Sequence, residues 1–318
     1  MTRQKGFALV LVLWVLSLLT IMAGSFALSM RREASIIGGI RNNAQALAVA
    51  ESGIALAEMM LLNPDPNKRW RADGNIYEIS AANAKVRVRL ISETGKIDIN
   101  KADQTLLQGL MTSAPVDEEQ QTRLVSAILD WRDTDDLVHL DGAEKKEYKD
   151  AGLSYQPRNK PFQTIEELQL VLGMDEAVFL WIEPLITVYS GQQHVEAQLA
   201  AKEVLQVIPG LDTELIDTYI KTRLESAINN LPAPSFPSSP GQNNAPGQNN
   251  VLTLVSEALL DDESSAVISV VAKQSDETGA TPFQVLKWQH VTGNNNSLFT
   301  DAMSELLVKQ YAEPELNH

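Results

Sequence analysis

An uncharged apolar run near the amino terminus constrains this chain more than any other feature. From Phe7 to Met30 no Asp, Glu, Lys or Arg interrupts a stretch dominated by Leu, Val, Ala and Ile. At about 1.5 Å per helical residue, the run is roughly 36 Å long, which is sufficient to cross a bilayer. Basic residues flank both ends, so the positive charges leave its orientation open. The run predicts one transmembrane segment over 7–30.

The helical pattern continues beyond this segment. Apolar and small residues recur at roughly helical spacing through 31–63 and stop before Pro64 and Pro66. The simplest interpretation is one helix of about 55 residues, half in lipid and half packed on a folded domain as a stem. The many alanines and Gly53 permit close packing against a sheet or another helix.

Three interpretations of the amino terminus compete. An uncleaved signal anchor is the ordinary one. A secretory signal peptide cut near Ser25 and Ala27 fits poorly, because the apolar run is much longer than the usual core of about 7–15 residues. The third interpretation is a type IV prepilin leader, which the sequence Lys-Gly-Phe at 5–7 resembles.

The prepilin interpretation makes residues 1–6 a leader. A dedicated peptidase cuts such leaders after a glycine and methylates the new amino terminus, which here implies cleavage between Gly6 and Phe7 and N-methylation of Phe7. Glycine suits a cleavage site because the backbone can extend into a protease cleft without side-chain hindrance. Because the cut precedes the apolar run, the helix would survive as membrane anchor and assembly stem.

Strand patterns on both sides of a helical region predict an α+β fold with an inserted α-domain. The resemblance to pilin-like proteins implies the rest of the arrangement: a long N-terminal helix on an antiparallel pilin-like sheet, with a large inserted all-α domain of helix-hairpin-helix or SAM-like type. The sheet is expected in two parts, 70–97 and 251–318, and the inserted domain in 98–230. Residues 232–250, rich in Pro, Gly, Ser and Asn, are predicted to be a mobile linker that buries no core. Expected strands are 76–79, 86–90, 251–257, 265–273 and 282–291, and expected helices are 103–112, 117–131, 164–172, 175–188, 198–207 and 212–228.

Acidic residues outnumber basic ones, 41 to 26, and give a formal net charge of −15. This excess argues against general nucleic-acid binding and favours a hard cation such as calcium. Eleven carboxylates fall within 117–150, densest around Asp130 and Asp133. The spacing is not that of an EF-hand, so composition leaves a solvated acidic loop open as the alternative. There is no cysteine, which excludes disulfides and thiolate ligands.

Together, these features resemble the K-type minor pseudopilins of bacterial type II secretion over nearly the whole chain. The likeness lies in the prepilin juncture, the inserted helical region and the pattern Ile-Leu-Asp-Trp-Arg-Asp-x-Asp-Asp…Gly-Ala-Glu at 128–144. Most pilin-like subunits have glutamate at the fifth mature position. This chain has Leu11 there, and the K-type family shares the lack of this glutamate. The departure suits a first or tip subunit with no neighbour ahead. The resemblance also favours calcium, with these expected ligands: Asp133, Asp135, Asp136, Glu144 and Asp130.

The resemblance implies a minor pseudopilin that caps or initiates the pseudopilus tip and supports export of folded proteins across the outer membrane. Expected partners are I- and J-type minor pseudopilins, then the H-type and the major pseudopilin, and the prepilin peptidase. The secreted substrate and the outer-membrane secretin are further candidate contacts. The implied location is the inner membrane, single-pass, with the bulk of the chain in the periplasm.

Three stretches, at 96–107, 161–174 and 203–211, resemble helix-hairpin-helix units. In two of them Asp175 and Asp212 follow the hairpin, where a carboxylate would repel a phosphate, so no nucleic acid is expected. One alternative is nevertheless a membrane-anchored DNA receptor of the competence type, which predicts salt-sensitive DNA binding and no processing. Another is a minor type IV pilin, which the sequence separates less easily.

Catalytic motifs are missing from the sequence. The four histidines form no His-Glu-x-x-His pair, and there is neither a Gly-x-Ser-x-Gly elbow nor a phosphate-binding loop with lysine. A carboxylate cluster without a substrate-pocket motif is more often ionic or structural, so the chain is not expected to be an enzyme.

Overall fold

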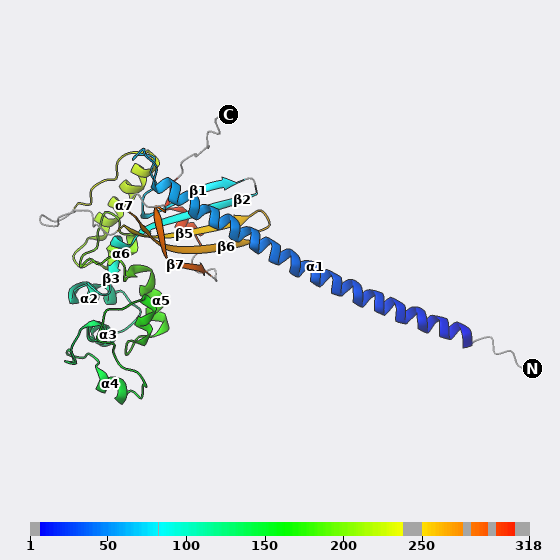
Figure 1. The fold of residues 1–318 in the computed structure, drawn as a ribbon, viewed down its shortest axis with the longest axis horizontal. Helices are drawn as coiled ribbons and strands as arrows, with labels where there is room; N and C mark the ends of the chain where they lie inside the picture. The colour runs from blue at the N-terminus through cyan, green and yellow to red at the C-terminus, as the bar shows by residue number, and fades with distance from the viewer. Residues whose placement is uncertain (1–6, 82, 238–249, 276–280, 292–296, 309–318) are drawn as a thin grey trace, which may run out of the picture.

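The computed structural model describes residues 7–81, 83–237, 250–275, 281–291 and 297–308. It has a long N-terminal helix, a sheet on which the far end of this helix packs, and a mainly helical region beyond the sheet (Figure 1). The predicted α+β class, with helical material inserted between strands of one sheet, is confirmed.

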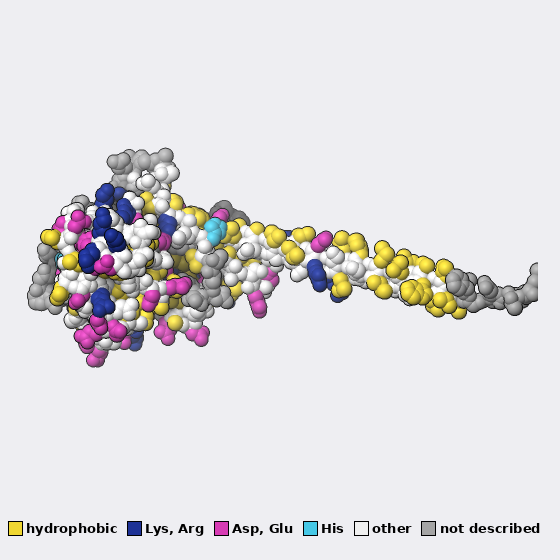
Figure 2. All heavy atoms as spheres, turned by 90° about the horizontal axis from the view of Figure 1, so that it is seen from below, with side chains coloured by type: hydrophobic (Ala, Val, Ile, Leu, Met, Phe, Trp, Pro, Cys, Tyr) yellow, Lys and Arg dark blue, Asp and Glu magenta, His cyan; other side chains and the backbone are white. Residues whose placement is uncertain are grey.

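Helix α1 runs without a break from Phe7 to Leu61 and has 55 residues. It is long and apolar enough to cross a membrane, and its most apolar window is not buried against the rest of the chain. Figure 2 shows hydrophobic side chains along this outer half of the helix. The other half packs on the sheet through buried Ala50, Ile54 and Ala57. At Gly53 an added Cβ would lie 2.3 Å from the Ser256 hydroxyl, so only glycine permits this approach.

The sheet has six strands in the order β7-β6-β5-β2-β1-β8. All neighbours are antiparallel except β1 and β8, which are parallel. Strands β2 and β5 pair directly, Ser92 with Leu252, although the whole helical region lies between them in sequence. The strand bounds are β1 Asp73–Ala81, β2 Ala84–Ser92, β5 Val251–Leu260, β6 Ser265–Gln274, β7 Phe283–Val291 and β8 Leu307–Val308, and the short helix α8 (Asp301–Ser304) precedes β8.

The inserted region is not purely helical, which corrects the expectation of an all-α insertion. Strands β3 (Ile97–Asp98) and β4 (Ile186–Thr187) form a short parallel pair within it. Its helices are shorter than predicted at three places, where the chain forms 3₁₀ turns or loops instead. The elements are η1 Glu93–Gly95, α2 Gln104–Thr112, α3 Glu118–Arg132, α4 Lys145–Asp150, η2 Ile165–Leu170, α5 Glu176–Ile182, η3 Glu183–Leu185, α6 Lys202–Val207 and α7 Thr213–Ile228.

The insertion has its own hydrophobic core, distinct from the core between α1 and the sheet. Buried Glu93 bridges the two parts, because it accepts hydrogen bonds from Thr187 in β4 at 2.5 Å and Thr253 in β5 at 2.6 Å. Phe236 lies in the range predicted to bury no core, yet it is buried, and its ring centroid is 4.8 Å from that of Tyr219. Residues 238–249 of the predicted linker lie outside the described residues.

Candidate metal centre

The acidic residues predicted as ligands lie around the C-terminal end of α3 and the loop 133–144 that follows it. Aspartate 117 caps the start of α3 by accepting from the Gln120 N–H, and Trp131 near its end is buried against Phe162. The loop then folds back along the helix, where the Ser126 hydroxyl donates to the Leu140 carbonyl at 2.8 Å. This return brings the end of the loop beside the last turn of α3.

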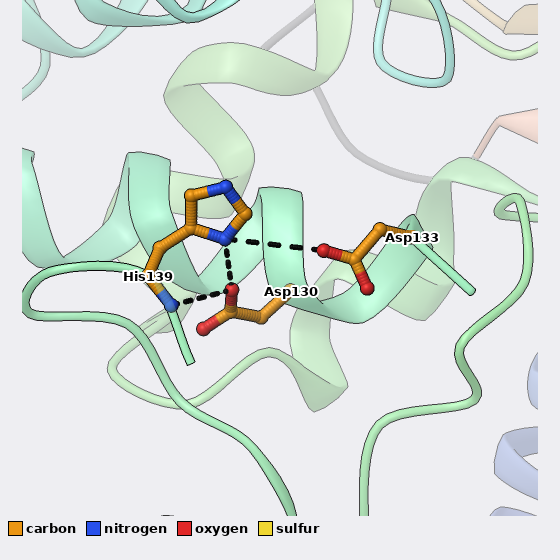
Figure 3. Close-up of side chains that lie close together, drawn as sticks. All are labelled: Asp130, Asp133 and His139. Carbon is orange, nitrogen blue, oxygen red and sulfur yellow. Dashed lines mark hydrogen bonds and ion pairs between the residues drawn. The ribbon is translucent and has the colours of Figure 1, made fainter. Parts of the chain in front are cut away.

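Asp130 holds the loop in place. Its side chain is completely buried and accepts the Ala143 N–H at 2.6 Å, the His139 N–H at 3.1 Å and a close contact from His139 Nδ1 (Figure 3). A Cβ at Gly142 would lie 2.1 Å from Asp130 Oδ2, so the loop can close over the carboxylate only with glycine there. Asp130 therefore organises the site as well as offering a charge to it.

Asp133 and Glu144 carry the unbalanced charge of the site. Asp133 Oδ1 and both carboxylate oxygens of Glu144 are buried and receive no well-formed hydrogen bond from the described residues, although Glu144 is the N-cap of α4 and its carboxylate faces the N–H groups at the start of that helix. Burial, reinforced by Asp130, Asp133 and Asp136, raises the pKa of Glu144 to about 7. Burial and the neighbouring Asp135 and Asp130 also raise the pKa of Asp133. Each carboxylate is therefore destabilised by its own neighbours, and a cation would relieve this repulsion.

Asp135 and Asp136 are more exposed than the other predicted ligands. Asp135 Oδ1 accepts the Leu137 N–H at 2.9 Å, and Asp136 Oδ1 accepts the Asn159 amide at 2.9 Å. These bonds shape the loop and leave other carboxylate lone pairs free for a ligand. The negative charge of Asp136 contributes to the raised pKa of Glu144.

Sequence reasoning missed His139. One ligand atom from each of Asp130, Asp133 and His139 lies within 4.8 Å of the other two, and His139 Nδ1 is 3.9 Å from Asp133 Oδ2. Nothing in the spacing of the acidic residues singles out this histidine, because the reversal of the loop places it. An oxygen-rich group of this kind suits a hard divalent cation, for which imidazole is a poor ligand. We therefore assign His139 to orienting Asp130.

The predicted processing site is only partly described. Gly6 lies outside the described residues, and Phe7 is the first residue of α1. Leu11, at the position where pilin-like subunits usually have glutamate, lies in α1 and is exposed at 54%. An uncharged side chain there is compatible with lipid.

The hairpins that resemble DNA-binding units present carboxylates at the following helix starts. Gly210, with φ of 84°, turns the chain between α6 and α7, and Asp212 then accepts the Leu215 N–H at 3.2 Å. Asp175 caps α5 in the same way, accepting from Val178 at 2.8 Å. A phosphate at either helix start would be repelled by the aspartate carboxylate. It would also find the helix N–H group already donating its hydrogen bond to that aspartate.

Comparisons with known proteins point to one family. Residues 75–191 match the model of the family described as type II secretion system (T2SS), protein K. Type II secretion system protein K of Klebsiella pneumoniae is 26% identical over 204 residues, covering 58% of this chain and 62% of that protein. The Aeromonas hydrophila protein of the same name is 24% identical over 209 residues, covering 58% and 63%. The matched region thus spans less than two thirds of either relative.

A shorter relative and one solved structure are also similar to this chain. Type II secretion system protein K of Dickeya chrysanthemi is 32% identical over 79 residues, covering 25% of this chain and 21% of that protein. A chain in the crystal structure of the GspK-GspI-GspJ complex from the enterotoxigenic Escherichia coli Type 2 Secretion System matches with a TM-score of 0.49 and 14% identity, covering 83% of this chain and 99% of that one. The family matches confirm the predicted resemblance to type II secretion protein K.

Proposed function

We propose that this chain, a relative of type II secretion system protein K, is a minor pseudopilin that caps or initiates the tip of the pseudopilus and supports export of folded proteins across the outer membrane. One observation carries the proposal. An unbroken helix of 55 residues has an apolar, exposed outer half and an inner half packed on a sheet, and the residues that match this family, 75–191, include most of β1, all of β2 and much of the inserted region. The family is one of secretion components and not a known enzyme family.

The shape supports a place at the tip. The inserted region lies at the end of the molecule opposite the start of α1 (Figure 1). If α1 is the stem, a subunit stacked above this one along the stem would collide with the insertion. Leu11 adds a second reason, because it offers no carboxylate to the amino terminus of a subunit ahead. A subunit with both properties starts or ends a fibre.

The expected partners follow from this role. We infer contacts with the I- and J-type minor pseudopilins, then the H-type and the major pseudopilin, and transient contact with the prepilin peptidase that cuts after Gly6.

The apolar half of α1 would anchor the chain once in the inner membrane, and the sheet and insertion would lie in the periplasm. The secreted substrate and the outer-membrane secretin stay candidate contacts of the exposed tip. The aspartate caps at the hairpins support the expectation of no nucleic-acid partner.

We propose calcium as the ion of the acidic loop. The residues fit it: Asp133 and Glu144 have buried oxygens without well-formed hydrogen bonds, and the surrounding side chains offer oxygen, the donor that calcium prefers. Asp133 and Glu144 would hold the ion, with Asp130, Asp135 and Asp136 as further oxygen donors. When bound, calcium supplies positive charge that lets these carboxylates ionise together and so fixes the loop.

The test of the pseudopilin proposal is the intact mass and N-terminal sequence of the membrane-extracted protein, made with and without its prepilin peptidase. We expect a chain that starts at N-methylated Phe7 only when the peptidase is present. Co-purification of the full chain with I- and J-type subunits is then the assay for tip assembly. An unprocessed amino terminus in both strains would refute the proposal and favour an anchored receptor.

A further inference from the structure

The loop 133–144 is held to the insertion in two halves. Its second half lies along α3, where buried Asp130 accepts the Ala143 N–H at 2.6 Å. In its first half, Asp135 and Asp136 are exposed to solvent. Because exposed residues gain little from burial, the position of this first half depends on the hydrogen bonds made to it.

Asn159 contacts the first half of the loop from a separate segment of the chain. Its Nδ2 group donates to the Asp135 carbonyl at 2.7 Å and to Asp136 Oδ1 at 2.9 Å. A carbonyl and an ionised carboxylate only accept hydrogen bonds, so the nitrogen of this amide, and not its oxygen, must face the loop. One side chain thereby fixes the backbone of one acidic residue and the carboxylate of the next.

The position of Asn159 is set by the segment that contains it. We call this segment, residues 157–162, the strap. Near one end of the strap, Arg158 donates to Glu167 Oε1 of η2 at 2.6 Å. Asn159 itself has a φ of 51°, a left-handed backbone conformation that asparagine adopts more readily than most residues. The strap is therefore bonded to η2 directly beside Asn159.

The other end of the strap enters the hydrophobic core of the insertion. Phe162 is buried, and its ring stacks on that of Trp131 with the centroids 6.0 Å apart. Its backbone N–H donates to Asn100 Oδ1 at 2.7 Å, and its carbonyl accepts from Asn100 Nδ2 at 2.9 Å. Trp131 follows Asp130 in α3, so the helix that holds the second half of the loop also holds the strap. Asn159 thus connects the first half to the same helix.

Repulsion between carboxylates makes this connection important for a cation. Burial, and then the charge of Asp135, raises the pKa of Asp133. Burial also raises the pKa of Glu144, and Asp136 is among the aspartates that add to this effect. Without a contact from outside the loop, Asp135 and Asp136 would move away, because separation relieves the repulsion. An ion would then have to bring the loop back, which lowers its affinity.

We propose that Asn159 is a positioning residue for calcium, which keeps Asp135 and Asp136 in place before the ion binds. The proposal rests on the proposed calcium site. Asn159 is not a ligand in it, because the amide nitrogen that faces the loop carries its hydrogens toward the acidic residues and offers no lone pair to a cation. Its effect on calcium is to preorganise the loop, so that less of the binding free energy is used to order it.

The test is calcium binding to the full chain in detergent, measured by calorimetric titration. Asn159→Gly removes the amide and permits the same left-handed backbone. Asn230→Gly is the matched control, because Asn230 follows α7 and has a φ of 52°. We expect Asn159→Gly to weaken calcium binding roughly tenfold and Asn230→Gly to leave it unchanged. Equal calcium affinity of Asn159→Gly and the wild type would overturn the proposal.

The substitution Asn159→Asp separates positioning from ligation. A carboxylate cannot donate to the Asp135 carbonyl, and its charge repels that of Asp136. We therefore expect Asn159→Asp to bind calcium more weakly than the wild type. Tighter binding would make the side chain at this position a ligand, and the proposed role of the amide would be wrong.

Limited proteolysis distinguishes a local effect from general unfolding. In a calcium chelator, chymotrypsin should cut Asn159→Gly faster than the wild type at exposed Leu137 and Leu140, and saturating calcium should slow this cleavage in both. Faster cleavage throughout the insertion would mean that Asn159 supports the fold and not the loop, which overturns the proposal. A wild-type chain that binds no calcium refutes this proposal together with the calcium site, whereas the pseudopilin role, tested by N-terminal processing, is unaffected.

Discussion

Replacement of Glu144 by glutamine tests the candidate metal centre most directly. The change Glu144→Gln keeps the shape of the side chain but removes its ionisation. In the protein, burial and the neighbouring aspartates raise the pKa of Glu144 from 4.5 to about 7. Each pKa unit is equivalent to about 1.4 kcal/mol, so an ionised Glu144 destabilises the calcium-free fold by roughly 3 kcal/mol at pH 8.

The sign of the pH dependence follows from the direction of the shift. Because the pKa is raised in the folded chain, the stabilising contribution of protonated Glu144 is complete below about pH 4.5 and is lost as the pH rises through about 7. In a calcium chelator, we expect Glu144→Gln to be more stable than the wild type at pH 8, by about 2–3 kcal/mol, and similar to it near pH 5. Calcium at pH 8 should reverse this order, because only the carboxylate binds the ion strongly.

The assay is urea unfolding of the full chain in detergent, followed by tryptophan fluorescence. Trp131, one of the chain's five tryptophans, is buried beside the site and reports on the insertion. Glu225→Gln in α7 is the matched control, since it removes an exposed carboxylate far along the sequence. A stability difference that does not change with pH, or a calcium effect equal in both proteins, would contradict the reasoning.

Three further substitutions test the packing that positions this site. Gly53→Val should destabilise the contact of α1 with the sheet by roughly 2–3 kcal/mol, seen in thermal melts, whereas Gly39→Ala, with open space around it, should not. Glu93→Ala should leave the largely covered ammonium group of Lys96, 2.8 Å away, without its partner and cost about 3 kcal/mol; faster trypsin cleavage between sheet and insertion would report it. Gly142→Ala should displace the loop from Asp130 and abolish stabilisation by calcium; an unchanged calcium titration would contradict the model of the loop.

Local patterns predicted most of the secondary structure. The apolar run and the small residues after it predicted one helix of about 55 residues, and α1 has 55. Alternation of Val86, Val88 and Leu90 with arginines predicted β2, whose apolar side chains are buried. These elements follow from a periodicity that tertiary contacts reinforce. Register and strand order did not follow, because β2 pairs with β5 across an insertion whose length no local pattern specifies.

The insertion shows where local reasoning was insufficient. The apolar spacing over 164–172 predicted an α-helix, but the chain forms the 3₁₀ turn η2, from which Leu168 is buried. The pairing of β3 with β4 depends on two residues from each strand, too few for a recognisable alternation. At the acidic loop, charge density predicted an ion site, which stays a prediction, but could not show which of the proposed carboxylates are buried. The structure shows this burial, which separates Glu144 from the more exposed Asp135 and Asp136.

The junction between sheet and insertion bears on the proposed tip role. A steric cap can act only if the insertion keeps its position relative to the stem. The chain leaves the sheet after Ser92 and returns at Val251, at adjacent ends of two paired strands. Buried Glu93 ties this point to β4, and Asp73 in β1 lies 3.7 Å from Arg223 of α7 as a second buried pair. Removal of one partner from such a pair is costly because it leaves an uncompensated charge, so these contacts oppose independent motion of the two parts. A force applied along α1 would therefore move the insertion with the stem, as a subunit at the head of a growing fibre requires.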